Sequence, residues 1–183
     1  MKLRYLFTAI LSALLFVSCS EENEPAQKAG VQALMMMTMK SAAELCDILG
    51  ETAMAERCRD CHSRMASVAS QVSEEYYKVA LAPGEPGSKQ GTSLMVLADM
   101  IDAKKANEEV IKVEGARGFS TFYGYYMLQA MAKAGDYAGA MKFISEFWGA
   151  MIDLGATTFW EDFHTDWIPN AAPIDALVPE GKK

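Results

Sequence analysis

A short segment, Gly155–Phe163, holds the residues whose types and spacing are best suited to acid–base chemistry. Its carboxylic acid Glu161 directly follows Trp160 and stands two positions before Phe163. A carboxyl group beside apolar rings loses hydration, which raises its pKa and leaves it with a proton to exchange. The segment therefore predicts an acid–base residue at Glu161.

A second motif, Cys58–His62, matches the C-x-x-C-H signature by which c-type haem is attached. Cys58 and Cys61 also fall at apolar positions of a helical stripe, where a free cysteine behaves as a small buried hydrophobe. We therefore expect core thiols and no cofactor, with covalent haem as an alternative. A disulfide is a further alternative, for which Cys46 is a more natural partner than a cysteine three positions away in one helix. Zinc is a poorer match, because the only other histidine is His164 and a fourth ligand is not obvious.

The composition is that of a globular protein of 183 residues, 51% of them hydrophobic, which suffices for one domain with a sizeable core. Acidic residues outnumber basic ones by 24 to 17, which gives a net charge of -7. The basic residues are scattered, so no cationic stripe is available to follow a phosphate backbone. We therefore expect no nucleic-acid partner.

Residues 1–19 have the pattern of a secretory signal peptide: a basic start, Met1–Arg4, and an apolar run, Tyr5–Val17, too short to span a membrane. The small residues before Cys19 resemble the lipobox of bacterial lipoproteins, in which the cysteine is acylated and becomes the new N-terminus. We expect cleavage before Cys19 and a lipid anchor on it, with an ordinary signal peptide as the alternative. The following Ser20–Glu24 resemble the acidic tag of some Bacteroidetes lipoproteins. The expected location is the outer membrane, with the protein exposed at the cell surface.

Residues 20–30 are expected to form an acidic linker, and residues 31–183 a helical domain. Apolar residues recur at steps of three or four, which predicts helices over 26–49, 54–79, 94–101, 119–131 and 137–152. Gly50 ends the first helix as a C-cap would, and Gly135 marks the turn of a helical hairpin. The segment 104–118 is a polar connection. Since no strand is predicted, the fold class is all-α, built from antiparallel helical hairpins.

The hairpin turn also allows a repeat protein as an alternative. Ala134–Ala140 resembles the turn of a tetratricopeptide unit, which would give a helical-repeat interaction lipoprotein. Such arrays need a period near 34 residues. The similar turn at Gly50 lies 85 residues before Gly135, which is no multiple of that period.

Two segments resemble the bacterial α-L-rhamnosidases of glycoside hydrolase family 78. They are Gly118–Tyr125 and Phe147–Glu161, and the second contains W-G-x-M-x-x-x-G-A-T-T-x-W-E, which this sequence keeps in full. The resemblance extends with decreasing sharpness from about Val31 to the end of the chain. It implies that the hairpins form part of an (α/α)6 six-hairpin barrel, with a sugar bound in a cleft at one end.

The same resemblance assigns Glu161 the role of general base in an inverting hydrolysis. A rhamnose-containing glycan is the implied partner. Flat apolar rings suit the C–H face of a deoxy sugar, so we expect substrate binding by the aromatic residues around Glu161, namely Trp160, Phe163, Trp167, Phe119 and Tyr123. His164 is expected at the polar rim.

The sequence departs from the family in two respects. Nothing between Glu21 and Arg117 resembles the segment that carries the family's general acid. A six-hairpin barrel needs about twelve helices, twice what about 160 residues provide at typical lengths. We therefore expect a catalytic fragment that is weak or inactive alone, and that associates with itself or with the missing half of the barrel.

Overall fold

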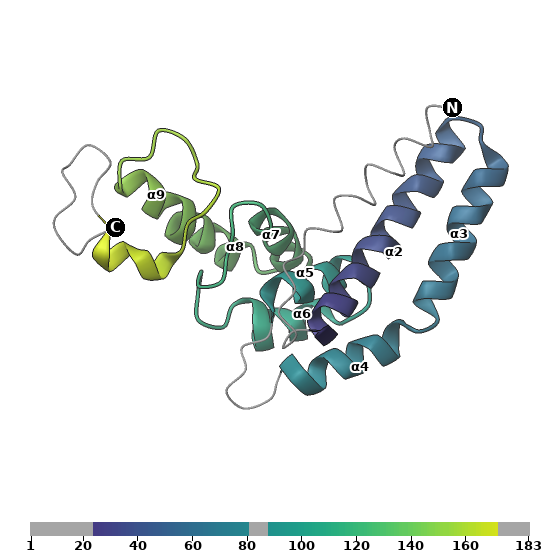
Figure 1. The fold of residues 1–183 in the computed structure, drawn as a ribbon, viewed down its shortest axis with the longest axis horizontal. Helices are drawn as coiled ribbons and strands as arrows, with labels where there is room; N and C mark the ends of the chain where they lie inside the picture. The colour runs from purple at the N-terminus through teal and green to yellow at the C-terminus, as the bar shows by residue number, and fades with distance from the viewer. Residues whose placement is uncertain (1–23, 81–87, 172–183) are drawn as a thin grey trace.

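The computed structural model of the chain describes residues 24–80 and 88–171 (Figure 1). Within these ranges the regular structure is entirely helical, which confirms the all-α class. The expected signal peptide, the acylated Cys19 and the start of the acidic segment lie outside the described residues. In the described part of the chain, no helix combines the length and the apolar character that crossing a membrane requires.

The described regular structure is a series of helices and helical turns. In chain order they are α2 (Glu24–Ile48), α3 (Thr52–Ala66), α4 (Ala69–Ala80), α5 (Lys89–Leu97), α6 (Ala103–Ala106), the π-helical turn η3 (Asn107–Ile111), α7 (Gly124–Lys133), α8 (Tyr137–Ile144), the π-helical turn η4 (Ser145–Gly149), α9 (Ala150–Asp153) and the 3-10 helix η5 (Thr165–Asn170). Figure 1 shows α2 and α3 side by side at one end of an elongated molecule, with α9 at the other.

The turn between α2 and α3 forms as the sequence predicts. Gly50 adopts a φ of 72°, and its N–H donates to the carbonyl of Asp47 at 3.1 Å. The N–H of Glu51 reaches back to the carbonyl of Cys46 at 2.8 Å, which completes a Schellman motif. The helix α2 begins at Glu24, two residues before the start predicted for the first helix, and it therefore covers residues 24–30 of the segment expected to be a linker. Ala29 is fully buried there, so this part of the expected linker belongs to the domain.

The single helix expected over 54–79 is wrong, since the structure divides it into α3 and α4. Ser67 lies at the junction, and its hydroxyl donates to the carbonyl of Arg64 at 2.7 Å, in competition with the helical bonding. Val68 follows Ser67 at this junction and is exposed. The hydroxyl of Ser73 in α4 donates to the carbonyl of Ala69 in its own helix at 2.7 Å, and it also lies 3.3 Å from the carbonyl of Met100, beyond the end of α5. The apolar pattern over 54–79 is therefore shared by two helices that point in different directions.

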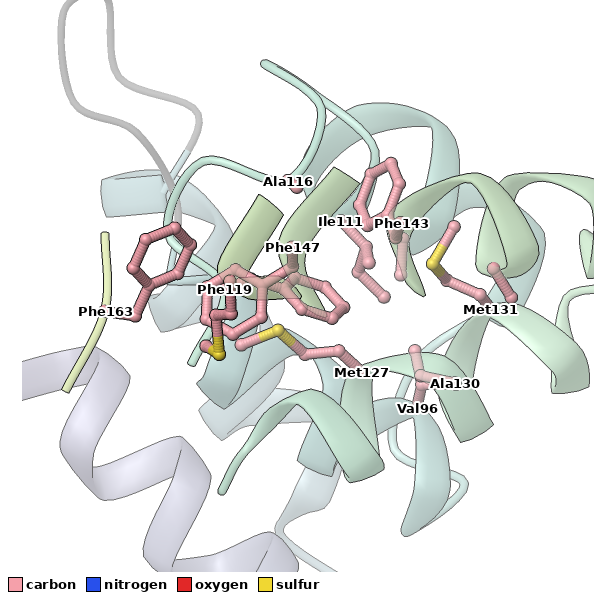
Figure 2. Packing of buried hydrophobic residues seen from close by; sticks show 13 residues of the cluster. Val96, Ile111, Ala116, Phe119, Met127, Ala130, Met131, Phe143, Phe147 and Phe163 are labelled. Atoms are coloured by element: carbon pink, nitrogen blue, oxygen red, sulfur yellow. The ribbon is translucent and has the colours of Figure 1, made fainter. Parts of the chain in front are cut away.

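Two hydrophobic clusters make up the core. The first fills the space between α5 and α9 and contains the residues labelled in Figure 2, namely Val96, Ile111, Ala116, Phe119, Met127, Ala130, Met131, Phe143, Phe147 and Phe163, together with Ala106, Ala140 and Met151. The second lies where α2 and α4 meet α5 and consists of Ala29, Ala33, Met36, Ala69, Leu94, Met95 and Ala98. The helix α5 contributes to both clusters.

The hairpin of α7 and α8 is confirmed, and its helix continues through η4 into α9. The polar connection expected over 104–118 is more structured than predicted. It contains α6 and η3, and its Val110 and Ile111 are buried. Asp136 joins these two parts of the fold. It caps α8 by accepting from the N–H of Gly139 at 2.9 Å, and its second oxygen accepts from the side-chain amide of Asn107 on η3 at 2.9 Å.

We expect Asp136→Ala to lower the free energy of unfolding by about 2 kcal/mol, because it removes an N-cap and leaves the buried amide of Asn107 without its acceptor. The hydrogen bonds from Asn107 and Gly139 lower the pKa of Asp136 in the folded protein. Their contribution is therefore present above the unfolded-state value of about 3.9 and is lost as the pH falls through the folded value. Thermal unfolding followed by circular dichroism at pH 7 and pH 3 measures both effects.

The matched control for this prediction is Asp102→Ala. Asp102 also caps a helix, accepting from the N–H of Lys105 at 2.8 Å, but it is exposed and caps only the single turn of α6. Its loss should cost less than that of Asp136. Equal losses of stability in the two variants would contradict the role of Asp136 as a link between η3 and α8.

Candidate functional site

The segment that carries Glu161 begins where α9 ends. Gly155 adopts a φ of 89°, and its N–H donates to the carbonyl of Ile152 at 2.8 Å. The N–H of Ala156 donates to the carbonyl of Met151 at 3.0 Å, so this helix also ends in a Schellman motif. The chain then turns back over the first cluster without regular structure until η5 begins at Thr165.

Aromatic side chains hold this segment against the core. Phe163 is buried, and its ring centroid lies 5.3 Å from that of Phe147 in an edge-to-face arrangement. Trp160 is half-buried and lies 5.7 Å from Phe163. The hydroxyl of Thr121, just before α7, donates to the carbonyl of Trp160 at 2.5 Å. The backbone is therefore fixed on both sides of Glu161.

The side chain of Glu161 is exposed, and so is that of Asp162. The desolvated setting expected from the neighbouring rings is therefore absent. The physical reason is that Trp160 and Phe163 turn inward, while the two acids between them point to solvent. What the structure provides is a solvent-accessible carboxylate on an anchored segment, which water can reach.

The remaining predicted site residues do not form one sugar-binding face. Phe119 is buried, with the rings of Phe143, Phe147 and Trp148 all within 6 Å of its own. Figure 2 shows Phe119 beside Phe147 among the core side chains. The rings of Phe119 and Phe163 are thus occupied by packing and offer no free face to a ligand.

Tyr123 and Trp167 occupy other settings. Tyr123 is half-buried and packs against both clusters, while Trp167 lies on η5 and is exposed. The ring of Trp167 is 6.3 Å from that of His164. The N–H of Asp166 donates to Nδ1 of His164 at 3.3 Å, and the carboxylate of Asp166 pairs with Arg117 at 3.2 Å. These contacts attach η5 to the loop that precedes Phe119.

Sequence reasoning missed two exposed rings on the segments that meet at Thr121 and Trp160. Phe122 is 70% exposed and adjoins Thr121, while Phe159 is 60% exposed and adjoins Trp160. Because Thr121 is bonded to Trp160, both rings leave the same junction as Glu161. The exposure of Phe122 could have been predicted from the helical period. Tyr123 and the buried Met127 and Met131 follow one another at steps of four and define the inner face, and Phe122 does not lie on that face.

The loop before Phe119 is held by Lys89, the first residue of α5. Its Nζ donates to the carbonyl of Gly115 at 2.5 Å and lies 5.6 Å from the ring centroid of Phe143. Burial lowers the pKa of Lys89 to about 8, while Glu114 and Glu146 favour its charged form. The amine is therefore mostly protonated at neutral pH and can bind the carbonyl and the ring together.

The thiols of the Cys58–His62 motif are free, and Cys58 is buried against Cys46 of α2. A buried thiol in the middle of α3 is poorly placed to bond to the edge of a porphyrin. Among residues 24–80 and 88–171, no group of three or more His, Cys, Asp or Glu side chains is arranged to hold a metal ion.

Comparison of the chain with protein-family models, curated proteins and solved structures gives no match. Any function assigned to the chain therefore depends on its own residues and their placement.

We expect Thr121→Val to release the backbone around Glu161, because it removes the only side-chain hydrogen bond that the described structure gives to the carbonyl of Trp160. Hydrogen exchange at the amides of residues 159–163 should become faster, while exchange in α7 stays unchanged. Thr157→Val is the control, since Thr157 lies exposed in the same segment. Equal exchange in wild type and Thr121→Val would show that aromatic packing alone holds the segment.

Proposed function

We propose that this chain is part of an inverting α-L-rhamnosidase-type glycoside hydrolase in which Glu161 is the general base. One observation carries the proposal: Glu161 is a solvent-exposed carboxylate on a segment whose flanking residues, Trp160 and Phe163, are anchored in the core. A base that activates water needs access to solvent and a fixed position, and this placement supplies both. The family resemblance of Phe147–Glu161 supports the same role.

In the proposed reaction, Glu161 takes a proton from a water molecule as the oxygen of that water attacks the anomeric carbon. A second carboxyl group, about 6.5–9.5 Å away in inverting enzymes, protonates the departing glycosidic oxygen. No residue of this chain is assigned to that second role. The exposed rings of Phe122 and Phe159 belong to the two segments that the Thr121–Trp160 hydrogen bond joins, and they are the surfaces proposed to stack on the sugar, together with Trp160.

We propose further that the described helices are part of a six-hairpin barrel. The inner face of the helix from α8 to α9 is buried through Phe143, Phe147 and Met151. Its outer face also carries large apolar side chains that are exposed, namely Tyr137, Met141, Ile144 and Ile152. These residues follow one another at steps of four, three and eight, which keeps them on one side of the helix. A further helix of a barrel, or a second copy of the chain, would cover them there.

The proposed location follows from the sequence pattern before the described residues. Acylation at Cys19 would hold the chain at the outer membrane, with the helical domain at the cell surface. This location suits a hydrolase that acts on a glycan outside the cell.

The test uses a substrate that needs no general acid, because a good leaving group departs without protonation. The purified chain is incubated with 2,4-dinitrophenyl α-L-rhamnoside, and release of the phenol is followed by absorbance. We expect slow hydrolysis that falls by about 10²-fold or more in Glu161→Gln, since general-base catalysis contributes roughly 10²–10⁴ in rate. An ordinary alkyl rhamnoside should be hydrolysed far more slowly, because its leaving oxygen requires the acid.

Asp162→Asn is the matched control, because Asp162 is the adjacent exposed carboxylate and has no assigned role. Its rate should equal that of the wild type, and proton NMR of the wild-type reaction should show the inverted anomer first. Hydrolysis at the rate of buffer alone, or equal rates in wild type and Glu161→Gln, would contradict the assignment of Glu161.

A further inference from the structure

Three thiols lie together where α2 packs on α3, and the proposed hydrolase does not use them. Cys46 of α2 and Cys58 of α3 are each only 3% exposed. Cys61 follows Cys58 by one helical turn and is partly exposed. Small side chains, Ala43 and Ala55, are buried in the same two helices and allow the helices to approach closely. The arrangement places one accessible thiol next to two inaccessible ones.

The two buried thiols lie on helices that pack directly against each other, Cys46 on α2 and Cys58 on α3. They are close enough for each thiol to affect the proton of the other. Burial, and then the neighbouring thiols of Cys46 and Cys61, raise the pKa of Cys58, so Cys58 is a poor nucleophile toward an external reagent. A disulfide needs two cysteines on neighbouring backbone segments, and the packed pair of α2 and α3 provides such segments.

The accessible thiol faces an open groove of about 560 Å³. Cys58 and Cys61 both line it, and its other lining residues are Met39, Met54, Arg57, Asp60, Ser63 and Arg64. Two of these residues, Arg57 and Arg64, are positively charged and one, Asp60, is negatively charged. The excess of positive charge favours the binding of an anionic reagent. Oxidised glutathione, a small anionic disulfide, has the matching chemistry.

We propose that Cys46, Cys58 and Cys61 form a thiol–disulfide exchange site, in which Cys61 accepts oxidation from a small external disulfide and passes it inward to a Cys46–Cys58 disulfide. The product joins α2 to α3 and leaves Cys61 as a free thiol in the groove. The site would therefore cross-link the helical hairpin in an oxidising compartment.

The steps balance in atoms and electrons. The Cys61 thiolate attacks the external disulfide R–S–S–R, forms a mixed disulfide and releases one R–S⁻, which takes up the proton that Cys61 lost. Cys58 then attacks the sulfur of Cys61, expels the second R–SH and forms a Cys58–Cys61 bond that is strained within one helix. Cys46 attacks Cys58, forms the Cys46–Cys58 bond and returns the proton to Cys61. The two protein thiols lose two electrons, and R–S–S–R gains them as two R–SH.

The experiment oxidises the full chain with oxidised glutathione, quenches samples with acid, alkylates the free thiols and maps the disulfides by mass spectrometry. Trypsin separates the three thiols into peptides 41–57, 58–59 and 60–64. In the final product we expect a disulfide between peptides 41–57 and 58–59, which carry Cys46 and Cys58. Peptide 60–64 should carry Cys61 in its alkylated form. The unfolding temperature of the oxidised protein should rise. Cys61→Ser should give the same product about tenfold more slowly or worse, because the reagent must then reach a buried thiol.

Ser63→Ala is the control, since Ser63 also lines the groove but carries no thiol. It should oxidise at the wild-type rate, and Cys61→Ala provides a second test if Cys61→Ser is poorly folded by circular dichroism. Three outcomes would overturn the proposal: a stable mixed disulfide on Cys61 as the end product, no bond between Cys46 and Cys58, or oxidation of both Cys61 variants at the wild-type rate. None of these outcomes bears on hydrolysis at Glu161.

Discussion

The fold depends on the burial of one short helix, α5, on all of its sides. Its residues 91–96 are all buried, and it supplies Val96 to one cluster and Leu94 and Met95 to the other. A nine-residue helix is not stable alone in water, so α5 forms because both clusters close around it. Conversely, the hairpin of α2 and α3 is connected to the site-bearing helices α7 to α9 largely through α5. The two hydrophobic clusters are therefore coupled through α5, which is stabilised by both of them together.

A lysine side chain binds at each end of α5, and one of these contacts connects the buried helix with the candidate site. At the C-terminal end, Nζ of Lys133 donates to the carbonyl of Val96 at 2.8 Å and to Asp99 at 2.6 Å. Asp99 adopts a φ of 60°, a conformation that costs energy for a residue other than glycine. At the other end, Lys89 fixes the loop that delivers Phe119. That loop precedes Thr121, whose hydrogen bond positions the backbone next to Glu161.

Periodicity predicted where the helices are, but it could not decide which of two apolar faces is buried. The glycine turns and the hairpin around Gly135 were predicted correctly, because C-caps and turns depend on local chemistry, whereas α7 begins at Gly124, five residues after its predicted start. In the helix after Asp136, however, both faces are apolar. Tyr137 and Met141 are exposed, whereas Phe143 and Phe147 are buried. The choice depends on what packs against the helix, and that partner is distant in sequence. The exposure of Glu161 was missed for a similar reason, since adjacency in sequence gives no direction to a side chain outside a helix.

The motif W-G-x-M-x-x-x-G-A-T-T-x-W-E can now be separated into residues that the fold requires and residues that it does not. Trp148 packs over Gly124, where an added Cβ would lie 2.6 Å from the indole. Met151 is buried, and the backbone of Gly155 is left-handed. Trp160 anchors the segment. The two threonines and Glu161 are exposed, and packing does not account for their presence. Structural necessity thus explains Trp148, Met151, Gly155 and Trp160 without any catalysis, and the case for a hydrolase rests on the exposed residues that the scaffold carries but does not need.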